Sequence, residues 1–372
     1  MTRTLPLLSL GPLVRRKALT LVCVAAAFSG ATISQPVFGK CTIECKHVIK
    51  SDFRSCKETC PHRRPGKPCR KACMDDKTAH GAACRTATDP IPPSCGETCG
   101  TFVRSWTPQP DGPLYALAVD RNGNVFAGVA NATVQKFTNS GTLLTTFGSF
   151  GTANGQFQSI DGMAVDGAGN VFVADSNIHR VQKFNNGGTF VTAWGTMGSG
   201  DGEFAAFGPF GVGVDSRGNV FVTDTGNSRV QKFTNDGIFV RSFGTAGIGN
   251  GEFIQPIAVA VDVADDVVVA DNERLDVQKF TNDGSFQTGW QVGSGNSDPL
   301  GVAVDSGGNV FVANSGNDDV QRFDGSGVLL AMWGMTGSGN GEFMGPFGVG
   351  VDSSGSIFVA DGTNRIQKFA CP

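Results

Sequence analysis

Acidic and basic residues recur in pairs along the carboxyl-terminal part of the chain, four or five positions apart. The three pairs are Asp175 with Arg180, Asp224 with Arg229, and Asp361 with Arg365. A ring of such charges on one face of a protein could bind a ligand. Each pair could equally hold its own hairpin through a hydrogen-bonded ion pair. A residue that repeats with the fold serves the fold first, so we interpret these pairs as structural.

Two neighbouring loops depart from this pairing. One carries Asp276 at the Arg position, and the next carries Asn314 and Asp319 at the Asp and Arg positions. The residues of the two loops that could contact a partner are Asn272, Glu273, Arg274, Asp276, Asn314, Asn317, Asp318 and Asp319. They form an acidic, non-equivalent sector, which we predict as the first candidate site for a partner or a cation. Drift on a solvated face would explain the same departures equally well.

Residues for catalysis are scarce in the segment 101–372. Its single histidine is His179 and its single tyrosine is Tyr115. Neither a three-histidine zinc site nor a Ser-His-Asp constellation can be built from this set. The Gly-rich segments 198–204 and 337–343 lack the Lys-Ser/Thr pair of a phosphate-binding loop. We therefore predict no catalytic residue and no metal ligand here.

Cysteines are concentrated in residues 40–100. Four pairs share the Cys-x-x-x-Cys spacing, and one cysteine stands alone. The cysteines that could form disulfides are Cys41, Cys45, Cys56, Cys60, Cys69, Cys73, Cys84, Cys95, Cys99 and, next to the carboxyl terminus, Cys371. A spacing of four residues puts both sulfurs on one face of a helix, which predicts a small, disulfide-rich helical module.

The pairing of these cysteines stays open at the level of sequence. The first two pairs resemble the stapled helical hairpin of small secreted peptides, which would join Cys41 to Cys60 and Cys45 to Cys56. Zinc is the alternative, because histidines lie among the cysteines. They are His47, His62 and His80. The usual zinc motif has two residues between its cysteines, so we favour disulfides.

The amino terminus has the three parts of a secretory signal peptide. Basic residues at 15–17 precede an apolar run over 18–28 and small residues at 29–31. We predict a signal peptide over 1–31, with an uncleaved anchor as the alternative. Removal of Cys23 leaves an even number of cysteines, which is typical of an oxidising compartment. We expect a secreted, periplasmic or cell-surface protein with no membrane span after cleavage.

A repeat organises residues 101–372. Its clearest copy is 211–244, in which four short strand patterns are separated by turns rich in Gly, Asn and Asp. A Val-Asp pair ends the first strand of each copy. The aspartates of this pair are Asp120, Asp166, Asp215, Asp262, Asp305 and Asp352. Six four-stranded sheets of this size bury both of their faces when they stand radially as a β-propeller.

The repeat resembles a known family. The pattern G-V-x-V-D-x-x-G-N-V-F-V-x-D-x-x-N-x-R-V-Q-K-F, followed by D-G-x-F and G-x-G-x-G-E-F, resembles the NHL repeat over residues 102–372. The resemblance implies an all-β, six-bladed propeller. Residues 101–106 match a fourth strand, and the last copy stops after its third. We therefore predict that the two ends share one blade, closed by a disulfide from Cys371 to Cys99 or, failing that, to Cys95.

Charge separates the two parts of the chain and bears on function. Residues 40–100 carry 12 Lys and Arg against 7 Asp and Glu, whereas residues 101–372 carry 14 against 26. An acidic propeller argues against binding of a nucleic acid backbone. We predict an exported, monomeric, non-catalytic module that binds a protein, peptide or glycan. Six-bladed relatives include zinc amidating lyases and calcium lactonases, so the alternative is a lyase or lactonase with calcium in the channel.

Overall fold

A computed structural model describes residues 42–45, 56–59, 99–109, 112–293 and 297–371. The chain divides into two compact units, residues 1–75 and 76–372. No helix among the described residues is long and apolar enough to cross a membrane. The predicted signal peptide lies outside these residues.

The first unit contains a pair of strands where helices were predicted. Strand β1 (Thr42–Cys45) pairs antiparallel with β2 (Cys56–Thr59), so that Cys45 is opposite Cys56 in the backbone register. The helical prediction was wrong for these segments. A spacing of four residues puts two side chains on one side of a strand as well as of a helix, so it does not discriminate between them.

The disulfides predicted among the cysteines of residues 40–100 stay predictions, apart from the bond of Cys99 described below. Their remaining cysteines lie outside the described residues. These are Cys41, Cys60, Cys69, Cys73, Cys84 and Cys95.

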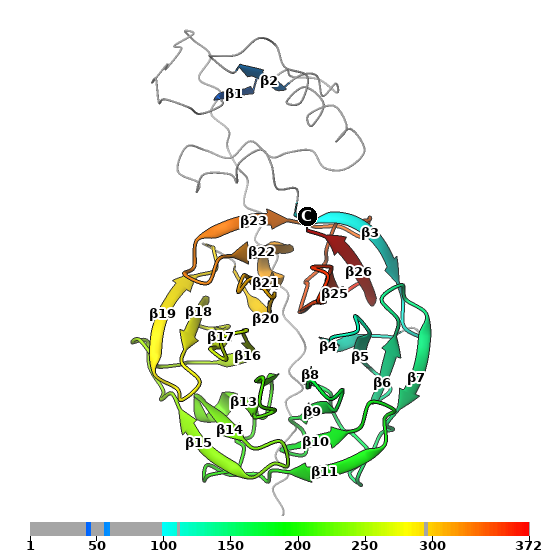
Figure 1. Ribbon diagram of the computed structural model, residues 1–372, viewed down its shortest axis with the longest axis vertical. Helices are drawn as coiled ribbons and strands as arrows, with labels where there is room; N and C mark the ends of the chain where they lie inside the picture. Colours follow the sequence, from blue (N-terminus) through cyan, green and yellow to red (C-terminus); the bar gives the residue numbers. More distant parts are fainter. Residues whose placement is uncertain (1–41, 46–55, 60–98, 110–111, 294–296, 372) are drawn as a thin grey trace, which may run out of the picture. The chain divides into compact units, whose positions relative to one another are not determined.

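The second unit is a six-bladed β-propeller, and each blade is a four-stranded antiparallel sheet (Figure 1). Blade one has β4 (Leu114–Val119), β5 (Val125–Val129), β6 (Thr133–Phe137) and β7 (Leu143–Phe147). Blade two has β8 (Gly162–Val165), β9 (Val171–Asp175), β10 (Arg180–Phe184) and β11 (Phe190–Trp194). Blade three has β12 (Val212–Val214), β13 (Val220–Asp224), β14 (Arg229–Phe233) and β15 (Phe239–Phe243).

The remaining blades repeat this plan. Blade four has β16 (Pro256–Val261), β17 (Val267–Asp271), β18 (Asp276–Phe280) and β19 (Phe286–Gln291). Blade five has β20 (Pro299–Val304), β21 (Val310–Asn314), β22 (Asp319–Phe323) and β23 (Leu329–Trp333). Blade six has β24 (Gly348–Val351), β25 (Ile357–Asp361), β26 (Arg365–Ala370) and, from the start of the propeller, β3 (Thr101–Trp106). The first strand of each blade lies at the channel and the fourth at the rim (Figure 1).

The core lies between the blades. The second strand of every blade is buried along its whole length, as its run of β-branched and aromatic residues predicts. One apolar cluster joins Phe172 of blade two to Val220 of blade three, and Phe204 from the connecting loop is fully buried in it. Burial of both faces of each sheet therefore requires its neighbours, which favours a closed ring over isolated blades.

The ring closes as predicted. Strand β26 pairs antiparallel with β3, with Phe369 opposite Phe102. A disulfide joins Cys99 to Cys371, whose Cα atoms are 4.0 Å apart. The last blade is therefore assembled from both ends of the propeller, and the bond lies beside the seam.

The two ends of the ring are chemically distinct. Because the strands alternate in direction, the turns after first and third strands lie at one end, which we call the turn end. The connections after second and fourth strands lie at the other, which we call the loop end. At the turn end, Asn282 of blade four donates Nδ2 to Asp215 Oδ2 of blade three at 3.1 Å and accepts from Lys232 of blade three. This contact bridges two blades.

The same bridge recurs between blades two and three, through Lys183, Asn235 and Asp166. The junction of blades four and five departs from it. Gly325 stands at the Asn position, and Lys279 contacts Asp262 at 2.8 Å within its own blade.

Candidate functional site

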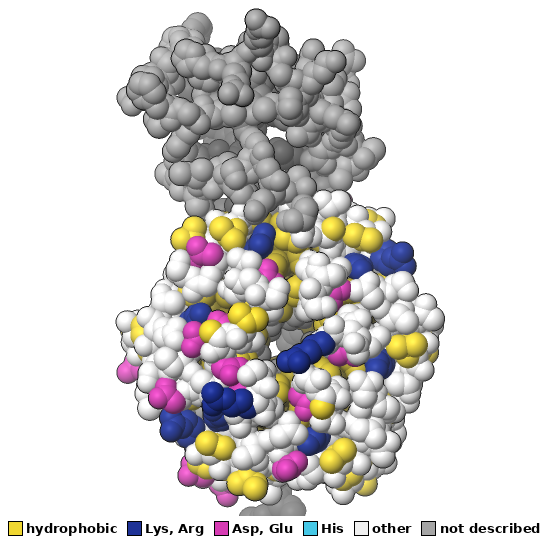
Figure 2. Space-filling model, in the orientation of Figure 1, with side chains coloured by type: hydrophobic (Ala, Val, Ile, Leu, Met, Phe, Trp, Pro, Cys, Tyr) yellow, Lys and Arg dark blue, Asp and Glu magenta, His cyan; other side chains and the backbone are white. Residues whose placement is uncertain are grey.

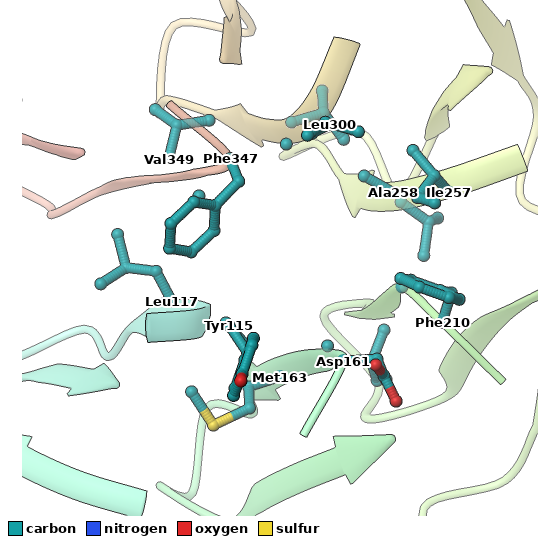
Figure 3. A pocket seen from close by; sticks show the side chains of 18 of the residues that line it. Tyr115, Leu117, Asp161, Met163, Phe210, Ile257, Ala258, Leu300, Phe347 and Val349 are labelled. Atoms are coloured by element: carbon teal, nitrogen blue, oxygen red, sulfur yellow. The ribbon is translucent and has the colours of Figure 1, made fainter. Parts of the chain in front are cut away.

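A cavity of about 420 Å³ opens at the loop end, where the first strands of all six blades begin. One residue per blade, five positions before the repeated Asp, lies around its opening (Figure 3). These residues, which we call the mouth ring, are Tyr115, Asp161, Phe210, Ile257, Leu300 and Phe347. Five of the six are aromatic or aliphatic, so the opening is largely apolar.

Three of the connections that lead into the first strands carry further exposed apolar residues at the loop end. Three positions before the mouth ring, blades three, four and six carry Phe207, Ile254 and Met344, which we call the mouth collar. They are 72%, 42% and 51% exposed, respectively. In the mouth ring itself, Tyr115 is 50% exposed. Exposed apolar residues on the same end of the ring as an apolar cavity are typical of an interaction site.

Asp161 is the single carboxylate of the mouth ring. Ser159 donates its hydroxyl to Oδ1 at 2.8 Å, and the backbone N–H of Ser176 donates to Oδ2 at 2.8 Å. These bonds hold the half-buried side chain at the opening while leaving further acceptor capacity on both oxygens. A cationic or hydrogen-bond-donating group in the cavity therefore has one fixed acceptor.

A second carboxylate lies deeper in the same blade. Asp175 is fully buried and accepts the backbone N–H groups of Gln158 at 2.8 Å and Ser159 at 3.1 Å. Burial raises the pKa of Asp175 to about 6, and the charge of Asp161 adds to the rise. The loop that carries Asp161 is therefore tied to a group that titrates near neutral pH.

The repeated acid–base pairs bind the loops of their own blades. Asp224 lies 2.8 Å from Nε of Arg229 and accepts the backbone N–H of Ala205 at 2.9 Å. Arg229 also donates to Gly200 O at 2.7 Å. In this blade, the pair therefore fastens the incoming connection rather than facing the channel.

The other two pairs differ in geometry. Asp361 and Arg365 are 3.4 Å apart in blade six. In blade two, Arg180 donates to Ala153 O at 2.7 Å, and its Nε has no hydrogen-bond partner among the described residues.

Much of the predicted acidic sector bonds inward. Buried Asp276 forms an ion pair with Arg274 at 2.8 Å, and buried Asn314 donates to Asp319 at 3.0 Å. Burial raises the pKa of Asp276 despite the Arg274 guanidinium.

Four other members of the sector reach solvent wholly or in part. Glu273 and Asn317 are exposed, while Asn272 bonds to Asp298 and half-buried Asp318 accepts from Gly345 N at 2.6 Å. The structure places these loops at the loop end, the same end as the cavity.

Comparison with known proteins identifies the repeat. The NHL repeat profile matches residues 157–184, 208–233 and 296–323. The chain contains NHL repeats. No curated protein matches its sequence.

Solved structures share the fold of this NHL propeller. A streptogramin B lyase aligns with a TM-score of 0.54 and 14% identity over 72% of this chain and 97% of that one. The virginiamycin B lyase of Staphylococcus aureus gives 0.53 and 12% over 72% and 98%. The WD40 propeller domain of Doa1 gives 0.50 and 14% over 70% and 79%. At these identities the likeness shows the propeller fold alone.

The NHL propeller separates its charges between its two ends. Among the described residues, the loop end has fourteen carboxylates and four arginines, whereas the turn end has eleven carboxylates and ten cations. The loop-end carboxylates are Asp161, Asp175, Asp201, Glu203, Asp224, Glu252, Asp271, Glu273, Asp276, Asp298, Asp318, Asp319, Glu342 and Asp361. The loop-end arginines are Arg180, Arg229, Arg274 and Arg365. Every lysine of the propeller lies at the turn end.

Charged side chains are exposed across the face of the ring as well as at its outer edge. Figure 2 shows one face of the ring, where positive and negative side chains lie interspersed around a central hollow. Within the part of the chain that the structure describes, no group of three or more His, Cys, Asp or Glu side chains could hold a metal ion. His179 Nδ1 lies 3.0 Å from Ala205 O.

Sequence reasoning missed the mouth ring and the charge separation. Both depend on position within the repeat, so aligning the copies on the repeated Asp would have found them. The mouth ring differs in residue type from copy to copy, which is why the consensus does not display it.

Proposed function

We propose that this NHL propeller is a non-catalytic binding module whose loop end docks a protein or peptide. The observation that carries the proposal is the apolar mouth, a cavity of about 420 Å³ with Tyr115 half exposed at its opening. Cavities of this size accept small ligands or protruding side chains. The aliphatic and aromatic collar supports a polypeptide over a glycan, because sugars need more hydrogen-bonding partners than this surface offers.

We further propose that the protein is exported and works as a monomer. The disulfide between Cys99 and Cys371 supports an oxidising compartment. Fractionation of the native source, followed by detection of the mature amino terminus, tests export. Recovery of the chain in the cytosol with residues 1–31 attached contradicts it.

Affinity capture from the native extracellular or envelope fraction tests the docking face. The test variant changes the collar, Phe207→Ser with Met344→Ser. The matched control changes two exposed apolar residues of the outer strand β7, Leu143→Ser with Leu144→Ser. We expect the collar variant to lose partners that wild type and control retain. An identical partner set for all three proteins removes the loop end as the docking face.

The alternative function is a calcium-dependent lyase or lactonase. It needs oxygen ligands that converge on one point of the channel. The observation that favours this alternative is the carboxylate of Asp161, which lies at the opening of the cavity. Elemental analysis of the purified protein tests it, since stoichiometric calcium supports this reading and its absence from protein purified without chelators removes it.

A further inference from the structure

The loop end offers a partner carboxylates but few cations. Each of its four arginines donates to a backbone carbonyl of an incoming connection. In blade three, Arg229 also bonds through Nε to Asp224. Arg274 is likewise held by Asp276 and by Gly249 O at 3.1 Å. A ligand at this end therefore meets a field that is net negative and is not balanced by free guanidinium groups.

Carboxylates reach solvent at the same end of the ring as the apolar cavity. Asp161 stands in the mouth ring itself, and Glu273 is exposed on the connection after β17 at the same end. Asp201 is also exposed, on the connection that enters blade three. The surface thus combines an apolar centre with acceptors for positive charge, which is the complement of a basic amphipathic segment.

We propose that the loop end binds a basic polypeptide segment, which inserts an apolar side chain into the cavity and pairs a lysine, arginine or amino-terminal group with Asp161. This inference rests on the proposed binding function and names the chemistry of its partner. A nucleic acid does not fit, because its phosphates would face uncompensated carboxylates. A small cationic ligand would fill the cavity but leave the collar, with Phe207 and Met344, uncovered.

The apolar residues and Asp161 make different kinds of contact with a bound segment. The collar and ring residues accept apolar side chains without directional demand, whereas Asp161 accepts a donor only along its remaining lone pairs. Ser159 and Ser176 already hold its carboxylate in place, so no side-chain rearrangement is required on binding. Apolar burial supplies affinity here, and Asp161 supplies the preference for a cation.

Three labelled peptides test the inference on the full-length, disulfide-intact protein. Each has nine residues with leucine at alternate positions and one central phenylalanine; the remaining positions are all lysine, all glutamine or all glutamate. Fluorescence anisotropy at low ionic strength gives the dissociation constants. We expect the lysine peptide to bind about tenfold or more tightly than the glutamine peptide, the glutamate peptide to bind weakest, and added salt to reduce the difference.

Matched variants locate the effect. Asp161→Asn should weaken the lysine peptide severalfold and leave the glutamine peptide unchanged. Asp236→Asn, which alters an exposed carboxylate at the turn end, should change neither. Thermal melting of both variants checks that the fold is retained.

The possible failures are distinct. Equal binding of the lysine and glutamine peptides, or an unchanged lysine affinity in Asp161→Asn, overturns the inference while the binding function stands. If none of the peptides binds, or if Phe207→Ser with Met344→Ser leaves all binding intact, the proposed docking face fails as well.

Discussion

Arg274 Nη2 lies 2.8 Å from Asp276 Oδ2, although the repeat would place the arginine at the position that Asp276 occupies. In blade four the arginine stands two positions earlier, in the loop before β18, and it still binds both a carboxylate and the incoming connection. Arg274 donates to Gly249 O, and Arg229 donates to Gly200 O at the equivalent place in its own connection. Blade four thus keeps a buried ion pair by a different route, and this departure from the repeat is compensated within the blade.

Removal of the Arg274 side chain should destabilise the fold, because the buried Asp276 carboxylate would lose its ion-pair partner. Arg274→Leu leaves Asp276 without its cation, and we expect a loss of roughly 3–5 kcal/mol in the free energy of unfolding. Arg274→Leu with Asp276→Asn should recover most of that loss, because position 276 then carries no charge that needs a cation. Urea unfolding of both variants checks this, and a double variant no more stable than the single one contradicts it.

Asp175 should make stability depend on pH. Its pKa rises from 3.8 to about 6 on folding, so between these values the folded protein holds a proton that the unfolded chain has lost. This contribution is therefore fully present below pH 3.8 and falls by about 3 kcal/mol as pH rises through 6. Asp175→Asn removes the titrating group. The difference in unfolding free energy between variant and wild type, measured from pH 4 to 7, should show this slope, and a flat difference contradicts it.

The missing turn-end bridge can be restored. Gly325→Asn puts an amide where blades three and four carry Asn235 and Asn282, within reach of Lys279 and of Gly308 O. We expect a gain of about 0.5–1.5 kcal/mol, the usual worth of one added hydrogen bond. Gly325→Ala is the control, since it adds Cβ without the amide. Equal stability of the two variants in thermal melts argues against a restored bridge.

The disulfide should stabilise the closed ring strongly. Cys99 and Cys371 are 272 positions apart, and for a loop of this length the chain-entropy treatment gives an upper figure of about 5–6 kcal/mol. Cys99→Ser with Cys371→Ser should lower the melting temperature, whereas wild type treated with a reductant should follow the variant. A variant that melts with the oxidised wild type shows that pairing of β3 with β26 suffices alone.

The strands and turns of the propeller could be predicted from sequence because the same strand and turn patterns recur in each of the six copies. Six blades were indicated by the repeated Val-Asp pair and by buried runs such as Val220–Val222. A shared last blade was indicated by the fourth-strand pattern at Thr101–Trp106, which precedes the first copy. The proximity of Cys99 and Cys371 followed from that closure. Periodic patterns carry this information because strand direction and burial repeat with them.

The candidate site could not be predicted in the same way. Tyr115, Asp161 and Phe210 share no residue type, and only the closed ring brings their six equivalent positions around one opening. The ion pair of Arg274 with Asp276 could not be predicted either, because this arginine stands in the loop and not at the Arg position of the repeat. The cysteine spacing near Cys45 and Cys56 was ambiguous, since it fits a strand as well as a helix.

Closure by a disulfide also changes the topology of the covalent chain. From Cys99 to Cys371 the backbone and the sulfur bridge form one macrocycle that contains every blade. A protease that cuts once in any exposed connection of that circle opens it without releasing a fragment. Two cuts, or one cut and a reductant, are needed before a blade can leave. The propeller can therefore be nicked in a protease-rich environment and remain a single molecule.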